Sequence, residues 1–113
     1  MIHVFMDDLR SCPEGFVFAR SVEECLLLLT GSEVGVLSLD YDMGFGQATG
    51  LDLVHSMINH QAFPQEIYLH SSHQWGRSQM HQLLYHHKPT HVRLYAYPMP
   101  DDVKNKIREE KRS

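Results

Sequence analysis

Four aspartates in two short segments are the residues of this sequence best suited to chemistry. Asp7 and Asp8 follow an apolar run that begins at Ile2, and Asp40 and Asp42 follow another apolar run. Neighbouring carboxylates repel one another unless a proton or a cation neutralises them. Carboxylate oxygens are also the ligands that Mg²⁺ and Mn²⁺ prefer. The spacing therefore predicts a divalent-metal site, with Mg²⁺ or Mn²⁺ as cofactor and all four aspartates as candidate ligands.

A simpler interpretation of these acids stays open beside the metal site. An aspartate that follows a strand readily caps a turn or a helix through its side chain. Asp42 has the weaker claim to be a ligand, because it begins the loop at 42–48, and its direction depends on how that loop turns.

Two further pairs of residues could serve a phosphate chemistry. His70 and Ser71 follow a third apolar run. An imidazole beside carboxylates can exchange a proton near neutral pH, so we expect His70 and Asp40 to be catalytic and Ser71 to donate a hydrogen bond to substrate. Arg77 lies near the start of a helical pattern, where anions bind favourably, and we expect it and Arg10 to bind substrate phosphate. Ion pairs with nearby carboxylates remain the alternative for both arginines.

The segments that position these residues alternate between strand-like and helical patterns. The strand-like runs span residues 2–6, 34–39, 66–71 and 92–97, with a short extended piece at 16–19. Capping pairs at Ser21 with Glu24 and at Thr49 with Asp52 predict two helix starts. A third helical pattern has Met80, Leu83, Leu84 and His87 on its inner face, and Asp101 could cap a tail helix.

This alternation predicts an α/β fold: a doubly wound, mostly parallel five-stranded sheet with helices on both faces. We expect one domain over residues 1–113, with 99–113 as a peripheral helical tail. Because the carboxyl ends of parallel strands meet at one edge, the acids, His70 and Ser71 should converge there.

The composition restricts the classes of function. Of 113 residues, 42% are hydrophobic and 21% charged, and no apolar run approaches the roughly 20 residues of a membrane span. No secretory-signal pattern opens the sequence, so we expect a cytoplasmic protein. The formal net charge of −4 argues against an extended nucleic-acid surface but is compatible with a small phosphate ligand.

The motifs at the strand ends resemble those of response-regulator receiver domains, which have the flavodoxin-like fold. An acidic pair follows the first strand, and the segment from Asp40 to Met43 matches the receiver's Asp-x-x-Met, with Asp40 at the phosphoacceptor position. The lysine that precedes proline in receivers is absent, because Tyr97-Pro98 stands there.

The chain resembles more closely a receiver-like family proposed to process cyclic phosphates. Five motifs occur in order over about the first 80 residues: Asp7-Asp8-Leu9-Arg10, Leu39 to Gly44, Thr49 to Asp52, His70-Ser71 and Gly76-Arg77-Ser78-Gln79-Met80. The resemblance implies a receiver-like fold and chemistry on a cyclic phosphate.

Three hypotheses about function remain open from the sequence. The first is a metal-dependent phosphoester hydrolase acting on a small phosphoester or a nucleic-acid end, such as a cyclic phosphate on a nucleotide or RNA. The second is a non-enzymatic, receiver-like regulatory module that binds Mg²⁺ or a phosphoryl group to control an unidentified protein partner. The third is a degenerate interaction domain that binds no ligand.

Overall fold

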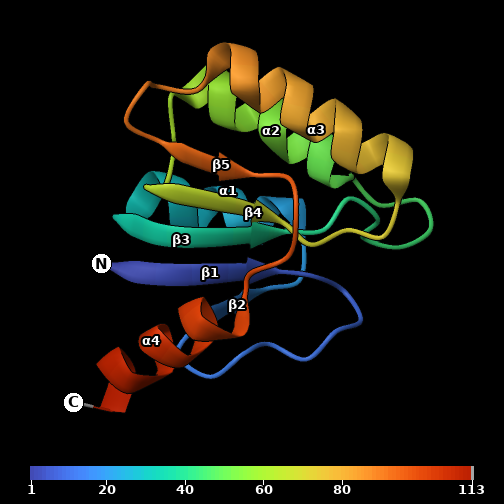
Figure 1. Ribbon diagram of the computed structural model, residues 1–113. Helices are drawn as coiled ribbons and strands as arrows, with labels where there is room; N and C mark the ends of the chain where they lie inside the picture. The colour runs from blue at the N-terminus through green and yellow to red at the C-terminus, as the bar shows by residue number, and fades with distance from the viewer. Residues whose placement is uncertain (113) are drawn as a thin grey trace.

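In the computed structural model, which describes residues 1–112, five parallel strands form one sheet in the order β2-β1-β3-β4-β5 (Figure 1). The strands are β1 Ile2–Met6, β2 Val17–Ala19, β3 Val34–Leu39, β4 Glu66–Leu69 and β5 Arg93–Tyr95. β3 occupies the centre of the sheet, and its six residues are all buried. The predicted α/β fold with a parallel five-stranded sheet is therefore confirmed.

Four helices connect or follow these strands within the described residues: α1 Val22–Gly31, α2 Gly50–His60, α3 Gln74–His87 and α4 Asp101–Arg112. The Ser21 side chain caps α1 by accepting from Glu24 N–H. Thr49 and Asp52 form the complete capping box that the sequence predicts at α2. α3 begins earlier than expected, with His73 as its cap.

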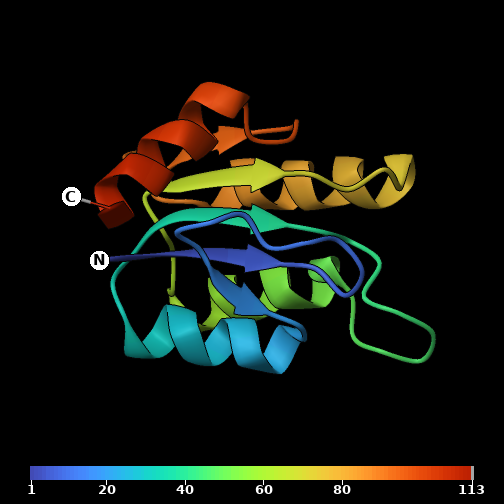
Figure 2. The same ribbon diagram turned by 90° about the horizontal axis from the view of Figure 1, so that it is seen from below.

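One face of the sheet is covered by three helices. Figure 2 shows α1 and α2 together on one side of the strands. Buried side chains of α1, α2 and α3 pack there on alternate residues of β1, β3 and β4; the helical contributors are Val22, Cys25, Leu29, Leu53, Val54, Met57, Met80 and Leu84. His87 was expected on this inner face but is exposed.

The other face has a smaller core beneath α4 (Figure 2). Phe5, Val36 and Tyr68 from β1, β3 and β4 pack there against Met99 and Ile107. β1 and β2 are joined by residues 7–16, which contain no helix. The division into a domain and a peripheral tail stays a prediction, and its last residue, 113, lies outside the described residues.

The candidate residues converge at one edge because every strand runs in the same direction. In Figure 1 the arrowheads point to the edge where the loops after β1, β3 and β4 extend. β4 ends at Leu69 and β5 spans only Arg93–Tyr95, so both are shorter than predicted. His70 and Ser71 thus belong to the loop between β4 and α3. No helix of the described part of the chain is long and apolar enough to cross a membrane.

Candidate metal and phosphate site

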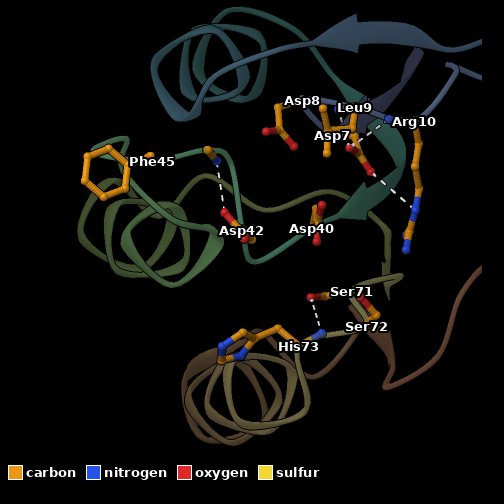
Figure 3. Close-up of a pocket in the computed structure, with 11 residues that line it drawn as sticks. Asp7, Asp8, Leu9, Arg10, Asp40, Asp42, Phe45, Ser71, Ser72 and His73 are labelled. Carbon is orange, nitrogen blue, oxygen red and sulfur yellow. Dashed lines mark hydrogen bonds and ion pairs between the residues drawn. The ribbon is translucent and has the colours of Figure 1, made fainter.

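A pocket of about 480 Å³ opens at this edge of the sheet. Its lining comes from the three loops that follow β1, β3 and β4. The lining residues are Asp7, Asp8, Leu9, Arg10, Asp40, Asp42, Gly44, Phe45, Ser71, Ser72 and His73. Figure 3 shows Asp40 between Asp7 on one side and Ser71 on the other. All four predicted aspartates therefore face one cavity, although they lie in two distant segments of the chain.

Asp7 is the most firmly fixed of the four carboxylates. Its side chain is 1% exposed, and its Oδ1 accepts hydrogen bonds from the backbone N–H groups of Leu9 and Arg10 at 2.9 and 3.1 Å. Its Oδ2 accepts from His70 Nε2 at 2.8 Å. Burial alone would raise the pKa of Asp7, but these hydrogen bonds outweigh it and the pKa lies below the ordinary value of 3.8. Asp7 is therefore ionised at neutral pH.

Asp40 follows β3 and has the opposite electrostatic balance. Burial raises the pKa of its carboxyl, and the negative charge of Asp7 raises it further. Hydrogen bonds from the Ser71 hydroxyl and from Tyr41 N–H, the latter at 2.8 Å, oppose this rise without cancelling it. The two neighbouring acids thus have pKa values displaced in opposite directions, as expected of carboxylates that share a site.

Asp8 and Asp42 line the pocket from its more exposed side. Asp8 is half-buried, and none of the described residues donates a hydrogen bond to its carboxylate. Asp42 is exposed, and its Oδ1 accepts from Gly44 N–H at 3.0 Å. Asp42 lies in the loop that follows β3, and its side chain lines the same pocket as Asp40. Its hydrogen bond to its own loop is the capping role foreseen as the alternative.

His70 lies behind Asp7 and outside the pocket lining. Its ring is 6% exposed and stacks on Phe5 with centroids 4.5 Å apart. Nε2 bonds Asp7, and Nδ1 lies 2.6 Å from the hydroxyl of the buried Ser38. Burial lowers the pKa of His70 to about 4, although Asp7 acts in the opposite direction. The imidazole is therefore neutral at pH 7, and both ring nitrogens have protein partners.

Ser71 and His73 line the pocket from the loop after β4. Ser71 is 2% exposed, and its hydroxyl oxygen accepts from His73 N–H at 3.1 Å while it bonds the Asp40 carboxyl. His73 Nδ1 accepts from Gly76 N–H at 3.0 Å, so a neutral His73 ring carries its proton on Nε2. The sequence pattern places His73 on a helix surface and gives no sign that this helix cap faces the acids.

The two predicted phosphate ligands have different positions. Arg10 lines the pocket, where its Nε lies 4.0 Å from Asp7 Oδ2 and its guanidinium donates to the His70 carbonyl at 2.6 Å. Arg77 does not line this pocket; its guanidinium donates to the Ser71 carbonyl at 3.1 Å. Arg10 is the one arginine or lysine in the described pocket lining.

The glycines of the sequence motifs fix the loop after β3. A Cβ at Gly50 would lie 2.2 Å from the Asp40 carbonyl oxygen and 2.8 Å from Met80 Sδ. A Cβ at Gly76 would lie 2.2 to 2.6 Å from three atoms of the Tyr41 ring. Both distances are far below normal contact, so only glycine allows α2 and α3 to pack this closely around the end of β3.

Two aromatic residues near the carboxyl edge of the sheet, Trp75 and Tyr97, are not part of the pocket lining. Trp75 is 57% exposed and contacts Tyr41 and His73 edge-on outside the lining. Tyr97 packs near Tyr68 and Tyr95 on the α4 side of the sheet. The fully exposed Phe45, between two glycines with positive φ, lines the pocket instead.

The donor set at the pocket fits a hard divalent cation. Oxygens of Asp7 and Asp40 and a ring nitrogen of His70 lie within 4.8 Å of one another. His70 nevertheless uses its nearest nitrogen for the hydrogen bond to Asp7, so the available donors near Asp7 and Asp40 are oxygens. Several carboxylate oxygens with space for water are the environment that Mg²⁺ and Mn²⁺ prefer.

Comparison with known proteins gives one family match. Residues 2–86 match the family described as the cyclic-phosphate processing receiver domain, a span that contains every lining residue of the pocket. None of the curated proteins matches this sequence.

Proposed function

We propose that this chain, which belongs to the cyclic-phosphate processing receiver domain family, binds a divalent cation and hydrolyses a phosphoester such as a cyclic phosphate on a nucleotide or RNA end. The observation that carries the proposal is the charge of the pocket. Four carboxylates and one guanidinium line it. A phosphate would be repelled from this pocket unless a cation first offset the excess negative charge.

Asp7, Asp8 and Asp40 are the residues proposed to bind the cation, with Asp42 at the exposed edge. The cation, when bound, supplies charge neutralisation and polarises a phosphoryl oxygen. Arg10 would bind the non-bridging phosphate oxygens in bidentate geometry, because its guanidinium already lies in the pocket lining. When Asp40 binds the cation instead of the Ser71 hydroxyl, that hydroxyl would be free to donate a hydrogen bond to the phosphate.

Arg77 has an indirect part in this proposal. Its hydrogen bond to the Ser71 carbonyl fixes the loop that presents the Ser71 hydroxyl. It would therefore act on substrate binding through Ser71 and not by direct contact.

Proton transfer needs a group that faces the phosphate. Asp40 meets this condition, since it lines the pocket and its carboxylate can accept a proton from the attacking water. His73 also faces the pocket, with Nε2–H as the donor of its neutral ring, and is suited to donate a hydrogen bond to the leaving oxygen. His70, expected from the sequence as the catalytic residue, would contribute through Asp7, to which its ring is bonded.

Phe45 supports a ligand that carries a nucleobase. Its side chain is fully exposed on the loop after β3, and Figure 3 shows it at the opposite side of the pocket from Arg10. A phosphate near Arg10 and Ser71 would leave the rest of a nucleotide to extend toward this ring. Stacking of a base on an exposed aromatic side chain contributes about 1–3 kcal/mol and is tolerant of base identity.

Turnover of 2′,3′-cyclic nucleotides and of RNA with a cyclic end tests the proposal. We expect hydrolysis with Mg²⁺ or Mn²⁺ and none in EDTA. Asp40→Asn should lose at least about 100-fold in rate, since it removes a metal ligand and the candidate base. His70→Ala and His73→Ala separate the two histidines, because only His73 faces the pocket. Equal rates for wild type, Asp40→Asn and His70→Ala would refute this mechanism.

A second candidate function has one observation in its favour. Asp40 stands at the receiver phosphoacceptor position and lies beside the Ser71 hydroxyl and the other acids. This arrangement also suits a module that accepts a phosphoryl group and controls a partner protein. No lysine lines the described pocket, which speaks against the usual receiver switch. Intact mass after treatment with acetyl phosphate and Mg²⁺ decides, since a stable gain of one phosphoryl group that Asp40→Asn abolishes would favour the module.

A further inference from the structure

A buried polar chain of three residues runs across the centre of the sheet behind the pocket. It consists of Ser38, His70 and Asp7, whose exposed fractions are 0%, 6% and 1%. Ser38 Oγ lies 2.6 Å from His70 Nδ1, and His70 Nε2 lies 2.8 Å from Asp7 Oδ2. Ser38 does not line the pocket and cannot contact a ligand there.

Strand register brings these three residues together. Ser38 pairs with Phe5 in β1 and with Tyr68 in β4. Because side chains alternate along a strand, Asp7 follows Phe5 and His70 follows Tyr68 on the same face of the sheet as Ser38. The three polar groups thus occupy neighbouring positions at the carboxyl ends of the central strands, under the core that α4 covers.

The direction of each hydrogen bond follows from the chemistry of Asp7. An ionised carboxylate only accepts hydrogen bonds, so His70 Nε2 must carry the ring proton and donate a hydrogen bond to Asp7. In the neutral ring Nδ1 is then an acceptor, and the Ser38 hydroxyl must donate to it.

The chain leaves Asp7 with a defined orientation. Its carboxylate has about four lone-pair directions. Two backbone N–H groups and His70 use three of them. Asp7 also lines the pocket, so the direction that remains is the one open to a ligand.

We propose that Ser38 and His70 are positioning residues that orient the Asp7 carboxylate toward a divalent cation, with Ser38 fixing the His70 ring and His70 fixing Asp7. The inference rests on the proposed function only in taking Asp7 as a metal ligand. Partners of metal-binding carboxylates and imidazoles typically change metal affinity 10–100-fold when they are removed.

Titration of the full-length protein with Mn²⁺ at pH 7.5, without substrate, tests this inference. Ser38→Ala and His70→Leu should each weaken Mn²⁺ binding about 10-fold or more. His70→Gln should stay within about 3-fold of wild type, because the glutamine amide can donate to Asp7 without being able to transfer a proton. Ser56→Ala, on α2 and outside the pocket lining, is the matched control and should bind as wild type does.

Nitrogen NMR of the His70 ring in EDTA gives a readout that a general loss of stability would not imitate. Wild type should show protonated Nε2 and unprotonated Nδ1, and Ser38→Ala should shift the Nδ1 resonance while circular dichroism reports an intact fold.

The possible results separate the two proposals. Wild type that binds no Mn²⁺ overturns the metal site and this role together. Wild-type affinity in folded Ser38→Ala and His70→Leu overturns the positioning role alone. Equal weakening by His70→Gln and His70→Leu, with Nε2 losing its proton on titration with diamagnetic Zn²⁺, shows His70 to be a direct ligand and also overturns it.

Discussion

Replacing Asp40 by asparagine should stabilise the metal-free protein and abolish its stabilisation by Mg²⁺. Oxygens of Asp7 and Asp40 lie within 4.8 Å of each other. Two unit charges at that distance repel by about 1 kcal/mol in water and by about 3.5 kcal/mol at an effective dielectric constant of 20. Asp40 is half-buried, so a gain of about 1–2 kcal/mol is expected. Asparagine keeps the acceptor for Tyr41 N–H, so this hydrogen bond is retained.

Thermal unfolding in EDTA and in Mg²⁺ measures both effects. For a chain of this size, 1 kcal/mol corresponds to about 4 °C, so Asp40→Asn should melt about 4–8 °C above wild type in EDTA. Wild type should gain about 2.7 kcal/mol, or about 10 °C, at Mg²⁺ concentrations 100-fold above Kd. Glu33→Gln removes one negative charge at the opposite end of β3 and should change neither value appreciably.

The gain should also depend on pH with a defined sign. The folded-state pKa of Asp40 lies above its unfolded value of 3.8. Asp40 therefore destabilises the fold at neutral pH and stops doing so as the pH falls through its raised pKa toward 3.8. The difference between wild type and Asp40→Asn should shrink over that range. A variant that melts below wild type in EDTA, or that keeps the full Mg²⁺ response, would refute the reasoning.

Three other perturbations test separate parts of the structure. Gly76→Ala forces a Cβ against the Tyr41 ring and should cost about 1–3 kcal/mol in urea unfolding, whereas Gly31→Ala, with open space around it, should be neutral or stabilising. His70 binds a proton near pH 6.5 in the unfolded chain but only near pH 4 in the native state. The free energy of unfolding should therefore decrease by about 3 kcal/mol as the pH falls from 6.5 to 4, and His70→Gln should lack this loss. Phe45→Ala should leave the melting temperature within about 2 °C of wild type but weaken binding of a cyclic nucleotide about 5-fold or more, as isothermal titration would show; unchanged affinity would remove Phe45 from the ligand site.

The sequence predicts the sheet and the gathering of acids because both follow from local patterns. Apolar runs of five or six residues identify the buried strands β1 and β3 with their observed bounds. An aspartate that follows such a run must lie at the carboxyl edge of a parallel sheet. The positions of Asp7 and Asp40 needed no information beyond this.

Side-chain direction beyond the strand ends could not be predicted in the same way. Arg77 was expected to bind phosphate because it lies near the start of a helix, but it turns to the Ser71 carbonyl. His70 was expected to face the ligand, yet it follows β4 on the side of the sheet where its ring lies behind Asp7. Both outcomes depend on packing between segments that the sequence does not show to be neighbours.

Ser38 was missed although a signal for it exists. It is the one polar side chain in the run from Val34 to Leu39, two residues before Asp40 and hence on the same side of the strand. A buried hydroxyl needs a hydrogen-bond partner, because a buried polar group without one lowers the stability of the fold. A polar residue in step with a strand-end aspartate is therefore a useful indicator of supporting hydrogen bonds behind a site.

The hydrogen-bonded Asp7 carboxylate and the exposed loop at 44–47 could be redesigned independently of each other. Asp7 is secured by hydrogen bonds from three partners, whereas residues 44–47 carry Phe45 on a turn between two left-handed glycines. In the proposed function, ion affinity and the choice of organic group would therefore depend on different stretches of chain. Replacing Phe45 while Gly44 and Gly46 are kept should therefore change the choice of organic group and leave the hydrogen bonds of Asp7 and Asp42 in place.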